Sequence, residues 1–583
     1  MDDRLATLVP QPKAVRPLPG RLPLGAPHEV RPGRGDPGEA MVTAVTSALA
    51  RIPWPAGAPG GRPDGEPATA PLELHADSSL GPEAYRLTIT ADGLTVVAGG
   101  PAGAFYAVQT LRQLLPDDAW RSSAPRGAQW QLPAAEIEDE PALAWRGAHI
   151  DVARHFFPKR ELLSLIDALA AVKLNRLHLH LTDDQGWRVE SLAYPALQEI
   201  ASHRPRTRIS INDEQPVVYD DIPHGGYYTL ADLAEITRFA ADRMMTVVPE
   251  VDLPGHTAAL LAALPWLGAG TPPAEGYQVS ADWGILPCLI SPLPEARAAI
   301  GEILAELVRA TDARYVHIGG DECVLDAWDA DPRVDAYRRE RGLATAADLH
   351  ATFLRDLADM LATEFGARAV VWDDGFASAA GRAPGLRDDT IVMAWRGMQV
   401  ARAAADAGHD VVAVPVFPTY FYYFQERLPS EPVAIGGPVR IEDVAGFAPV
   451  PADWPAAARE RLLGTQFQVW TEYMPDSRAL EYMMFPRGCA LAEVAWTGGP
   501  AVWTAPAGQE APPGEGAQPQ RPVLRDRIEA HLRRLAAAGI EYRPLSGPLP
   551  WQQGGTGPRR HRPGLQVHDV AAHLDQLSSA EAL

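Results

Sequence analysis

Eight short apolar segments alternate with helix-length sequence through most of the chain, and this alternation constrains the fold more than any other feature. Each segment is rich in strand-forming residues and ends in polar or aromatic ones. The segments are 145–154, 175–184, 246–252, 314–322, 369–375, 390–397, 410–417 and 464–473. Repeated β-then-α units of this number close into a (β/α)8 barrel. The sequence therefore predicts an α/β chain with a TIM barrel, whose active site lies where the strands end.

The region before residue 142 has a different pattern and predicts a small α+β domain. Residues 85–90 alternate in hydrophobicity, Gly93 supplies a turn and residues 94–97 return, as in a β-hairpin. Residues 105–115 then repeat apolar side chains at helical spacing. We expect three parts: an N-terminal α+β domain at 1–141, the barrel at 142–545 and a mobile tail at 546–583.

Helix signals appear between and after the predicted strands. Pro158 precedes an apolar stripe at helical spacing, and Thr229 with Asp232 has the pattern of a capping box. A last amphipathic helix at 524–535 stops at Gly539, and we expect it to close the barrel. The Pro/Gly-rich residues 505–522 predict an insertion.

Charge and composition exclude several classes of function. The chain has 583 residues and a formal net charge of −22, so nucleic acid and an anionic membrane surface would be repelled. A neutral sugar would not be. Three cysteines are too few for a disulfide framework or a zinc cluster. The N-terminal sequence lacks an apolar signal segment, and we expect a cytoplasmic protein.

The octet 315–322 delivers two adjacent carboxylates to the end of a predicted strand. Gly319 and Gly320 allow a bend that residues with a Cβ resist, so Asp321 and Glu322 can face one ligand. Acidic, basic and indole side chains end the other strands as well. These are Arg154, His178, His180, Asp183, Asp184, Glu250, Asp252, His256, His317, Trp372, Trp395, Tyr420, Trp470 and Glu472. Carboxylates, one guanidinium and several indoles at one mouth suit a pyranose.

Several long motifs in order resemble the β-N-acetylhexosaminidases of glycoside hydrolase family 20. They are 151–157, 178–188, 249–256, 317–322, 470–472, 485–487 and 492–496, with 103–106 and 109–111 in the N-terminal region. The resemblance extends from about residue 85 to 544. It implies an exo-acting enzyme that releases terminal β-linked N-acetylhexosamine with retention from a small oligosaccharide or glycoconjugate, without cofactor or metal.

The resemblance also implies the catalytic roles. In this family the 2-acetamido oxygen of the substrate attacks the anomeric carbon, and an oxazolinium ion forms. Glu322 would be the general acid and base, with Asp183 and His256 as a relay behind it. Asp321 would stay ionised and accept the acetamido N–H. Tyr420 would hold the acetamido oxygen.

Substrate-binding residues follow from the same resemblance. Arg154 and Glu472 would bind ring hydroxyls, and Trp372, Trp395 and Trp470 would wall the acetamido group and the ring.

One position departs from the family pattern. The residue two places after Tyr420 is usually Asp and contacts hydroxyls at the far side of the sugar, but here it is Tyr422. A phenol is bulkier and neutral, so we expect Tyr422 to change substrate binding while the catalytic residues stay intact.

The sequence leaves two other functions open. A metal hydrolase would use His178 and His180, which lie on one face of a strand, together with His and Asp residues of later strands. A non-catalytic sugar-binding protein would account for Tyr422 but not for the retained Asp321 and Glu322. Long loops at 205–228 and 265–294 are expected to rim the site. The pattern leaves the choice between GlcNAc and GalNAc and the oligomeric state open.

Overall fold

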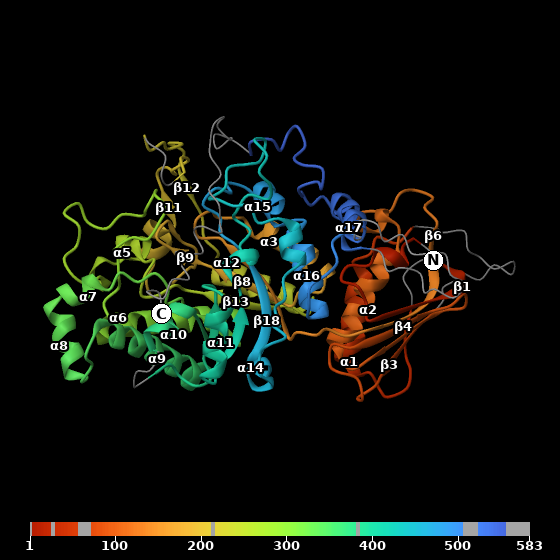
Figure 1. Cartoon of the computed structure of the whole chain (residues 1–583), viewed down its shortest axis with the longest axis horizontal. Coiled ribbons are helices and arrows are strands. Elements are labelled where there is room, and N and C mark those ends of the chain that lie inside the picture. The colour runs from red at the N-terminus through yellow and green to blue at the C-terminus, as the bar shows by residue number, and fades with distance from the viewer. Residues whose placement is uncertain are drawn as a thin grey trace.

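The structure is a computed structural model that describes residues 3–24, 29–55, 71–211, 216–379, 385–504 and 523–555. Figure 1 shows an N-terminal sheet with two helices beside a larger barrel of strands and helices. The predicted insertion at 505–522 lies outside the described residues, as does most of the predicted tail. No helix within the described ranges is long and apolar enough to cross a membrane.

The N-terminal body is a six-stranded sheet covered by two helices. Its strand order is β1-β6-β4-β5-β3-β2. The strands are β1 Ala14–Leu24, β2 Val30–Pro32, β3 Leu72–Ala76, β4 Tyr85–Ile89, β5 Leu94–Ala98 and β6 Trp130–Asp139. Helix α2 (Pro101–Leu114) packs on β4, β5 and α1 (Gly38–Ala50). The predicted hairpin is confirmed, since β4 and β5 pair antiparallel from Tyr85 opposite Ala98 to Ile89 opposite Leu94.

Eight parallel strands form a closed barrel, so the predicted fold is confirmed. They are β7 Trp145–Asp151, β8 Arg176–His180, β13 Thr246–Glu250, β14 Tyr315–His317, β15 Arg368–Trp372, β16 Ile391–Ala394, β17 Asp410–Ala413 and β18 Leu462–Val469. Each predicted segment overlaps one of these strands, although β15 and β18 begin before residues 369 and 464, where their segments were predicted to start. The polar ends of most segments lie in the loops that follow, where their side chains no longer have to alternate between the two faces of a strand.

Helices surround the barrel and short elements decorate its loops. The helices are α3 Lys159–Ala171, α4 Leu230–Ala241, α5 Ala258–Ala263, α6 Pro294–Thr311, α7 Asp326–Ala330, α8 Pro332–Glu340, α9 Ala346–Phe365, α10 Asp373–Ala379, α11 Met398–Asp406, α12 Val416–Thr419, α13 Ile441–Ala445, α14 Ala456–Arg461, α15 Ser477–Met484, α16 Arg487–Thr497 and α17 Leu524–Ala538. Short strands are β9 Thr182–Asp183, β10 Gly186–Trp187, β11 His203–Arg204 and β12 His224–Gly225.

The predicted starts of two helices, α3 and α4, are confirmed. Helix α3 begins directly after Pro158. At α4 the Thr229 hydroxyl accepts from the Asp232 amide at 3.0 Å, and the Asp232 carboxylate accepts from the Thr229 amide at 3.1 Å. Both hydrogen bonds of a capping box are therefore present.

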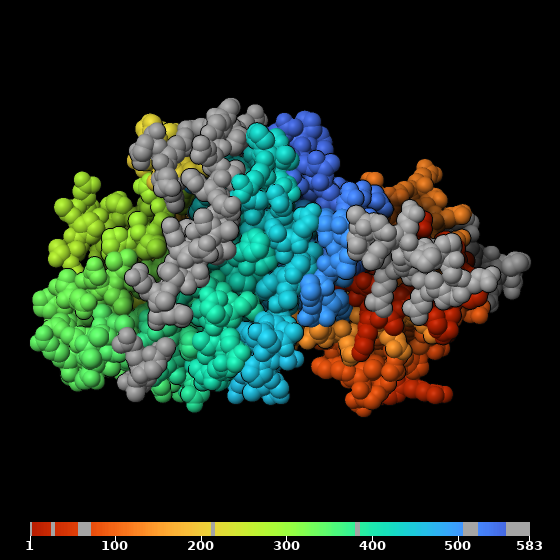
Figure 2. Space-filling view, in the orientation of Figure 1, coloured from red at the N-terminus to blue at the C-terminus, as the bar shows by residue number. Residues whose placement is uncertain are grey.

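The prediction that the last helix closes the barrel was wrong. Helix α16 packs on β7 and β18, the first and last strands of the barrel. Helix α17 packs instead on α16 and on two 3₁₀ turns of the N-terminal body, Leu5–Thr7 and Asp117–Trp120. Figure 2 shows this C-terminal segment, in blue, between the cyan barrel and the orange N-terminal body. An apolar stripe predicts burial of a helix face but not its partner.

Buried ion pairs join the two bodies. Lys173 Nζ lies 2.6 Å from Asp139 Oδ2, and the Trp496 indole donates to Asp139 Oδ1 at 2.8 Å. Arg146 of β7 pairs with Glu83 at 2.8 Å. The first part of the predicted tail, 546–555, also bonds to the barrel, because the Gly554 amide donates to the Ser430 carbonyl at 2.9 Å.

Candidate active site

A cavity of about 270 Å³ opens where the barrel strands end. It is lined by every residue to which the sequence analysis gave a catalytic or substrate-binding role: Arg154, Asp183, His256, Asp321, Glu322, Trp372, Trp395, Tyr420, Tyr422, Trp470 and Glu472. Five other strand-end residues expected at the same mouth do not line it: His178, His180, Asp184, Glu250 and His317. Asp252, Trp283, Gly284, Ile285, Val416, Tyr423 and Ile435 complete the lining. Aromatic walls with a few convergent charged groups are typical of sites for small polar ligands.

The turn after β14 requires its two glycines. Gly319 and Gly320 have φ angles of 66° and 104°, in the left-handed region. A Cβ on Gly319 would lie 1.6 Å from Asp252 Oδ1. The bend therefore depends on glycine, and it brings both Asp321 and Glu322 to the cavity.

Two residues that face each other in the cavity have unusual backbones. Glu322 has a φ of 50° and His256 a φ of 51°. A left-handed residue other than glycine costs about 1–3 kcal/mol and persists only where its surroundings enforce it. Here His256 Nε2 lies 3.3 Å from Glu322 Oε2, so both strained positions serve one contact.

Two carboxylates hold the other side of His256. Its Nδ1 lies 3.2 Å from Asp184 Oδ2 and 3.4 Å from Asp183 Oδ1. Burial alone would lower the pKa of His256, but Asp183, Asp184 and Glu322 raise it well above its usual value. The imidazole is therefore a cation at neutral pH. The structure brings Asp183 and His256 behind Glu322 and adds Asp184, which the sequence analysis did not assign to the relay.

Asp321 differs from the expectation that it stays ionised. Its side chain is buried, and its Oδ1 has no hydrogen-bond partner among the described residues. Burial and the nearby charge of Asp252 raise the pKa of Asp321 well above its usual value, and burial raises the pKa of Asp252 to about 7. Both carboxyl groups therefore hold a proton more tightly than an exposed Asp does. The sequence could not show this, because Asp252 comes from a different strand.

Charged groups also lie at the other side of the cavity. Arg154 Nη2 lies 2.8 Å from Asp183 Oδ2, and its Nε donates to Gln185 at 3.1 Å. Burial raises the pKa of Glu472 to about 7 although Arg154 opposes it. Glu472 Oε2 has no hydrogen-bond partner within the part of the chain that the structure describes. Arg154 and Glu472 can thus bind hydroxyl groups of a ligand.

The tryptophan walls are fixed by hydrogen bonds from their indole N–H groups. Trp372 donates to Glu250 Oε1 at 2.8 Å, and Trp395 donates to Asp374 Oδ2 at 2.8 Å. The rings of Trp372 and Trp470 lie 6.0 Å apart. Their faces therefore have defined orientations toward the cavity.

Two family models together match most of the chain. Residues 143–499 match the family model described as glycosyl hydrolase family 20, catalytic domain, and residues 6–140 match glycosyl hydrolase family 20, domain 2. The chain belongs to glycosyl hydrolase family 20. It is therefore a glycoside hydrolase, and the resemblance of the motifs is confirmed.

Curated relatives of family 20 cover most of this chain. A beta-hexosaminidase of Porphyromonas gingivalis is 34% identical over 436 residues, which are 74% of this chain and 53% of that protein. One of Akkermansia muciniphila is 32% identical over 449 residues, 73% of this chain and 82% of that protein. The chain thus spans about half the length of the first and most of the second.

Solved structures of family 20 agree with the fold. An exo beta-N-acetylglucosaminidase of Vibrio harveyi in complex with N-acetylglucosamine has a TM-score of 0.74 at 28% identity, covering 93% of this chain and 78% of that chain. A beta-N-acetylhexosaminidase of Streptomyces coelicolor has a TM-score of 0.71 at 28% identity, covering 94% and 99%. These similarities cover both bodies of the chain.

Tyr422 lines the cavity of this family 20 member from its expected position. Its hydroxyl lies 3.4 Å from that of Tyr423, and its ring centroid lies 5.9 Å from that of Tyr420. Burial raises the pKa values of both Tyr422 and Tyr423, and the charge of Glu472 adds to both shifts, while the contact between the two phenols raises the pKa of Tyr422 and lowers that of Tyr423. Two phenols therefore stand beside Glu472 where the family pattern has one carboxylate.

One of the two long loops predicted to rim the site reaches the cavity. Trp283, Gly284 and Ile285 of loop 265–294 line it. Loop 205–228, apart from the undescribed residues 212–215, supports them: the Arg208 carbonyl accepts from the Trp283 indole at 3.1 Å. Sequence reasoning missed Trp283, since a loop residue without periodicity carries no signal. It also missed Tyr423, which the aromatic run 420–424 could have indicated.

The histidines of the metal-hydrolase alternative lie below the cavity. His178 and His180 are fully buried, and both contact Glu250, at 3.0 Å from Nε2 and 2.6 Å from Nδ1 respectively. With His149, His178 and Glu250 place potential ligand atoms within 4.8 Å of one another. These residues do not line the cavity, so a metal held by them would not meet a substrate. Another group of potential ligand atoms, from Asp252, His256 and Asp321, does line the cavity. Membership in family 20 favours the glycosidase interpretation.

Cys323 follows Glu322 and is expected to react slowly with thiol reagents. Its thiol donates to the Asp321 carbonyl at 3.2 Å, and burial raises its pKa well above the usual value. The reactive species is the thiolate, so labelling with a maleimide near pH 7 should be slow, and Cys323→Ser should keep activity within about threefold because the hydroxyl still donates. Mass spectrometry measures the rate of labelling, and a kinetic assay measures the activity of the labelled protein and of Cys323→Ser. If Cys323 were labelled rapidly and the enzyme kept full activity, the thiol would not be held against the Asp321 carbonyl as described.

Proposed function

We propose that this protein is an exo-acting β-N-acetylhexosaminidase that hydrolyses terminal β-linked N-acetylglucosamine or N-acetylgalactosamine with retention. One observation carries the proposal: adjacent Asp321 and Glu322 share a cavity with Tyr420 and four tryptophans. Most retaining glycosidases need two carboxylates on opposite sides of the scissile bond, about 5–5.5 Å apart. Neighbours in one turn suit a different division, with one acid for the leaving group and one anion for a neighbouring group of the substrate.

In the proposed first step, Glu322 gives its proton to the glycosidic oxygen. The carbonyl oxygen of the acetamido group attacks the anomeric carbon, the bond to the leaving group breaks, and an oxazolinium ion forms. Asp321 accepts the acetamido N–H and stabilises the positive charge that develops on this group. For this step Asp321 must be ionised, and the incoming N–H donor favours its carboxylate form.

In the second step Glu322 acts as a base. It removes a proton from water, the water oxygen attacks the anomeric carbon, and the oxazolinium ring opens to restore the acetamido group. Two displacements at one carbon retain its configuration. The His256 cation beside Glu322 stabilises the carboxylate form of that group between the steps.

The test compares two chromogenic substrates that differ only in the acetamido group. A 4-nitrophenyl N-acetyl-β-glucosaminide should be hydrolysed, and the matching β-glucoside should react far more slowly because it lacks the internal nucleophile. A thiazoline mimic of the oxazoline should inhibit. Comparable rates on both substrates would contradict the proposed mechanism.

Tyr422 is expected to weaken binding of the hydroxyls farthest from the acetamido group. An ionised Asp accepts two strong hydrogen bonds and a phenol offers one weaker contact, a difference of roughly 1–3 kcal/mol. Tyr422→Asp should therefore lower KM for simple N-acetylhexosaminides, while the native enzyme should better tolerate a 6-deoxy substrate.

The control is Tyr423→Phe, which removes the neighbouring hydroxyl and leaves Tyr422 in place. Values of kcat/KM for 6-deoxy and unmodified substrates are measured for all three proteins. The ratio of the two should change in Tyr422→Asp and stay near the native value in Tyr423→Phe. An unchanged ratio in Tyr422→Asp would show that this side chain does not contact the C6 hydroxyl.

A further inference from the structure

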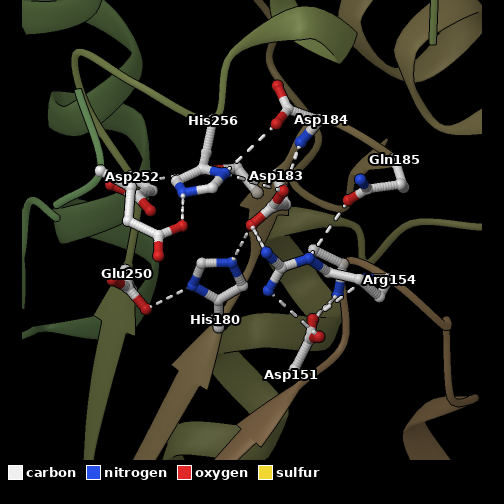
Figure 3. Close-up of polar contacts among 12 residues, drawn as sticks. Asp151, Arg154, His180, Asp183, Asp184, Gln185, Glu250, Asp252 and His256 are labelled. Atoms are coloured by element: carbon white, nitrogen blue, oxygen red, sulfur yellow. Dashed lines mark hydrogen bonds and ion pairs between the residues drawn. The ribbon is translucent and has the colours of Figure 1, made fainter. Parts of the chain in front are cut away.

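His180 lies between two carboxylates beneath the cavity, as Figure 3 shows. Its Nδ1 lies 2.6 Å from Glu250 Oε2 and its Nε2 lies 2.8 Å from Asp183 Oδ2. A neutral imidazole has one N–H and could donate to only one of them. Although burial opposes the charge, Glu250 and Asp183 raise the pKa of His180 well above its usual value. His180 is therefore a cation that binds both carboxylates at once.

The two carboxylate oxygens of Glu250 accept hydrogen bonds from different partners. Its Oε1 accepts the Trp372 indole N–H at 2.8 Å, and its Oε2 faces His180. Barrel register fixes the arrangement, because Glu250 of β13 is level with His180 of β8 and with His317 of β14. Side chains at the same level on neighbouring strands must meet in the barrel interior.

These contacts extend the relay across the barrel. Trp372, a wall of the cavity, binds Glu250, which binds His180, and His180 binds Asp183. Asp183 in turn contacts His256, which faces Glu322. Positive and negative groups alternate along this path, and Arg154 adds a third cation on Asp183, beside His180 and His256. His180 and Glu250 are fully buried and do not line the cavity.

We propose that His180 and Glu250 are positioning residues that hold the general acid and the wall of the acetamido subsite in one hydrogen-bonded assembly. The inference rests on the proposed function and deepens it. It assigns a task to two buried ionic groups that packing alone does not require, since an unpaired buried charge is costly and an apolar pair would fill the same space.

If His180 and Glu250 act through their charges, their removal should change the pH dependence of kcat/KM, which a packing role would not do. Removing the His180 cation raises the proton affinity of the carboxyl groups connected to it, so the basic limb of kcat/KM should move to higher pH. Removing the Glu250 anion should move it to lower pH. At an effective dielectric constant near 20, each shift is about half a pH unit to one unit.

Other groups face His180, Glu250 and Glu322. Apart from His180 and Glu250 themselves, they remain in every variant. His180 is also near Asp252 and the rings of His149 and Trp470. Glu250 faces three histidines and one tryptophan: His178, His180, His317 and Trp372. Glu322 faces His256 and lies near Asp321 and Asp374.

The experiment measures kcat/KM against pH for the native enzyme, His180→Gln, Glu250→Gln and the double variant, with one activated aryl substrate and one disaccharide. The two single variants should shift the basic limb in opposite directions, and the double variant should return it toward the native position. His180→Gln should slow the disaccharide more than the aryl substrate, because proton donation is impaired. Glu250→Gln should weaken thiazoline binding, because one amide cannot accept from both Trp372 and His180.

His531→Gln is the matched control, since His531 is a fully buried histidine of α17 beside Trp120. It should leave the pH profile unchanged. If Glu250→Gln does not fold, Glu250→Asp keeps the charge but is one methylene shorter, and it should weaken thiazoline binding without moving the basic limb. Shifts in the same direction for both single variants, or no shift in folded protein, would overturn the inference. Failure of the native enzyme to hydrolyse the N-acetylglucosaminide would instead refute the proposed function.

Discussion

Glu322→Gln is expected to slow hydrolysis of substrates with poor leaving groups by on the order of 10²- to 10⁴-fold. A disaccharide needs its leaving oxygen protonated as the bond breaks, and glutamine cannot supply that proton. An activated aryl leaving group departs as a stable anion and should be affected far less in the first step. The measurement is kcat/KM for a disaccharide and for a series of aryl N-acetylglucosaminides of different leaving-group pKa.

A change confined to recognition would give a different pattern. If Glu322→Gln slowed all members of the series by one factor, the residue would not be the proton donor. His256 provides the structural check on this variant. Its Nε2 lies 3.3 Å from Glu322 Oε2, and the glutamine oxygen can still accept from it, so unfolding temperatures of the two proteins should be close.

Asp321→Asn is expected to slow every substrate by a similar factor, on the order of 10²- to 10³-fold. The carboxylate stabilises charge on the acetamido group as each oxazolinium ion forms, whatever the leaving group. An amide keeps the size of the side chain but not its charge. The same aryl series measures this effect, and the slope of log kcat/KM against leaving-group pKa should stay near the native slope.

The surroundings of Asp321 allow Asp321→Asn to separate an effect on activity from an effect on stability. Burial and Asp252 favour the neutral form of the Asp321 carboxyl group, so a neutral side chain at this position should be tolerated by the fold. Asp321→Asn should therefore be as stable as the native protein or more stable while losing activity. A steeper leaving-group dependence, matching that of Glu322→Gln, would contradict the division of roles between the two acids.

Strand periodicity and strand-end chemistry in the sequence predicted much of this fold and of the cavity lining. All eight barrel strands overlap the predicted segments, because apolar runs separated by helix-length sequence have few other solutions. The predicted site residues meet in one cavity, because parallel strands all end at the same rim. The glycine-dependent bend before Asp321 and Glu322 followed from local stereochemistry alone.

Other features depended on contacts between distant parts of the chain. The helix at 524–535 has an apolar face that the sequence shows, yet its partners are α16 and the N-terminal body, not an open side of the barrel. Trp283 reaches the cavity from a long loop whose path is set by contacts with Arg208. Neither result follows from periodicity, which gives the face of an element and not its neighbour.

The sequence by itself determined the barrel, the position of the adjacent acids at a strand end and the membership of the site. Those properties follow from local preferences and from the repeat of β-then-α units, which act along the chain. The tertiary structure decided which charges face each other: Asp252 beside Asp321, Asp184 beside His256, and His180 between Asp183 and Glu250. Proton affinities depend on burial and on charges a few ångströms away in space, and barrel register brings those charges from strands far apart in sequence.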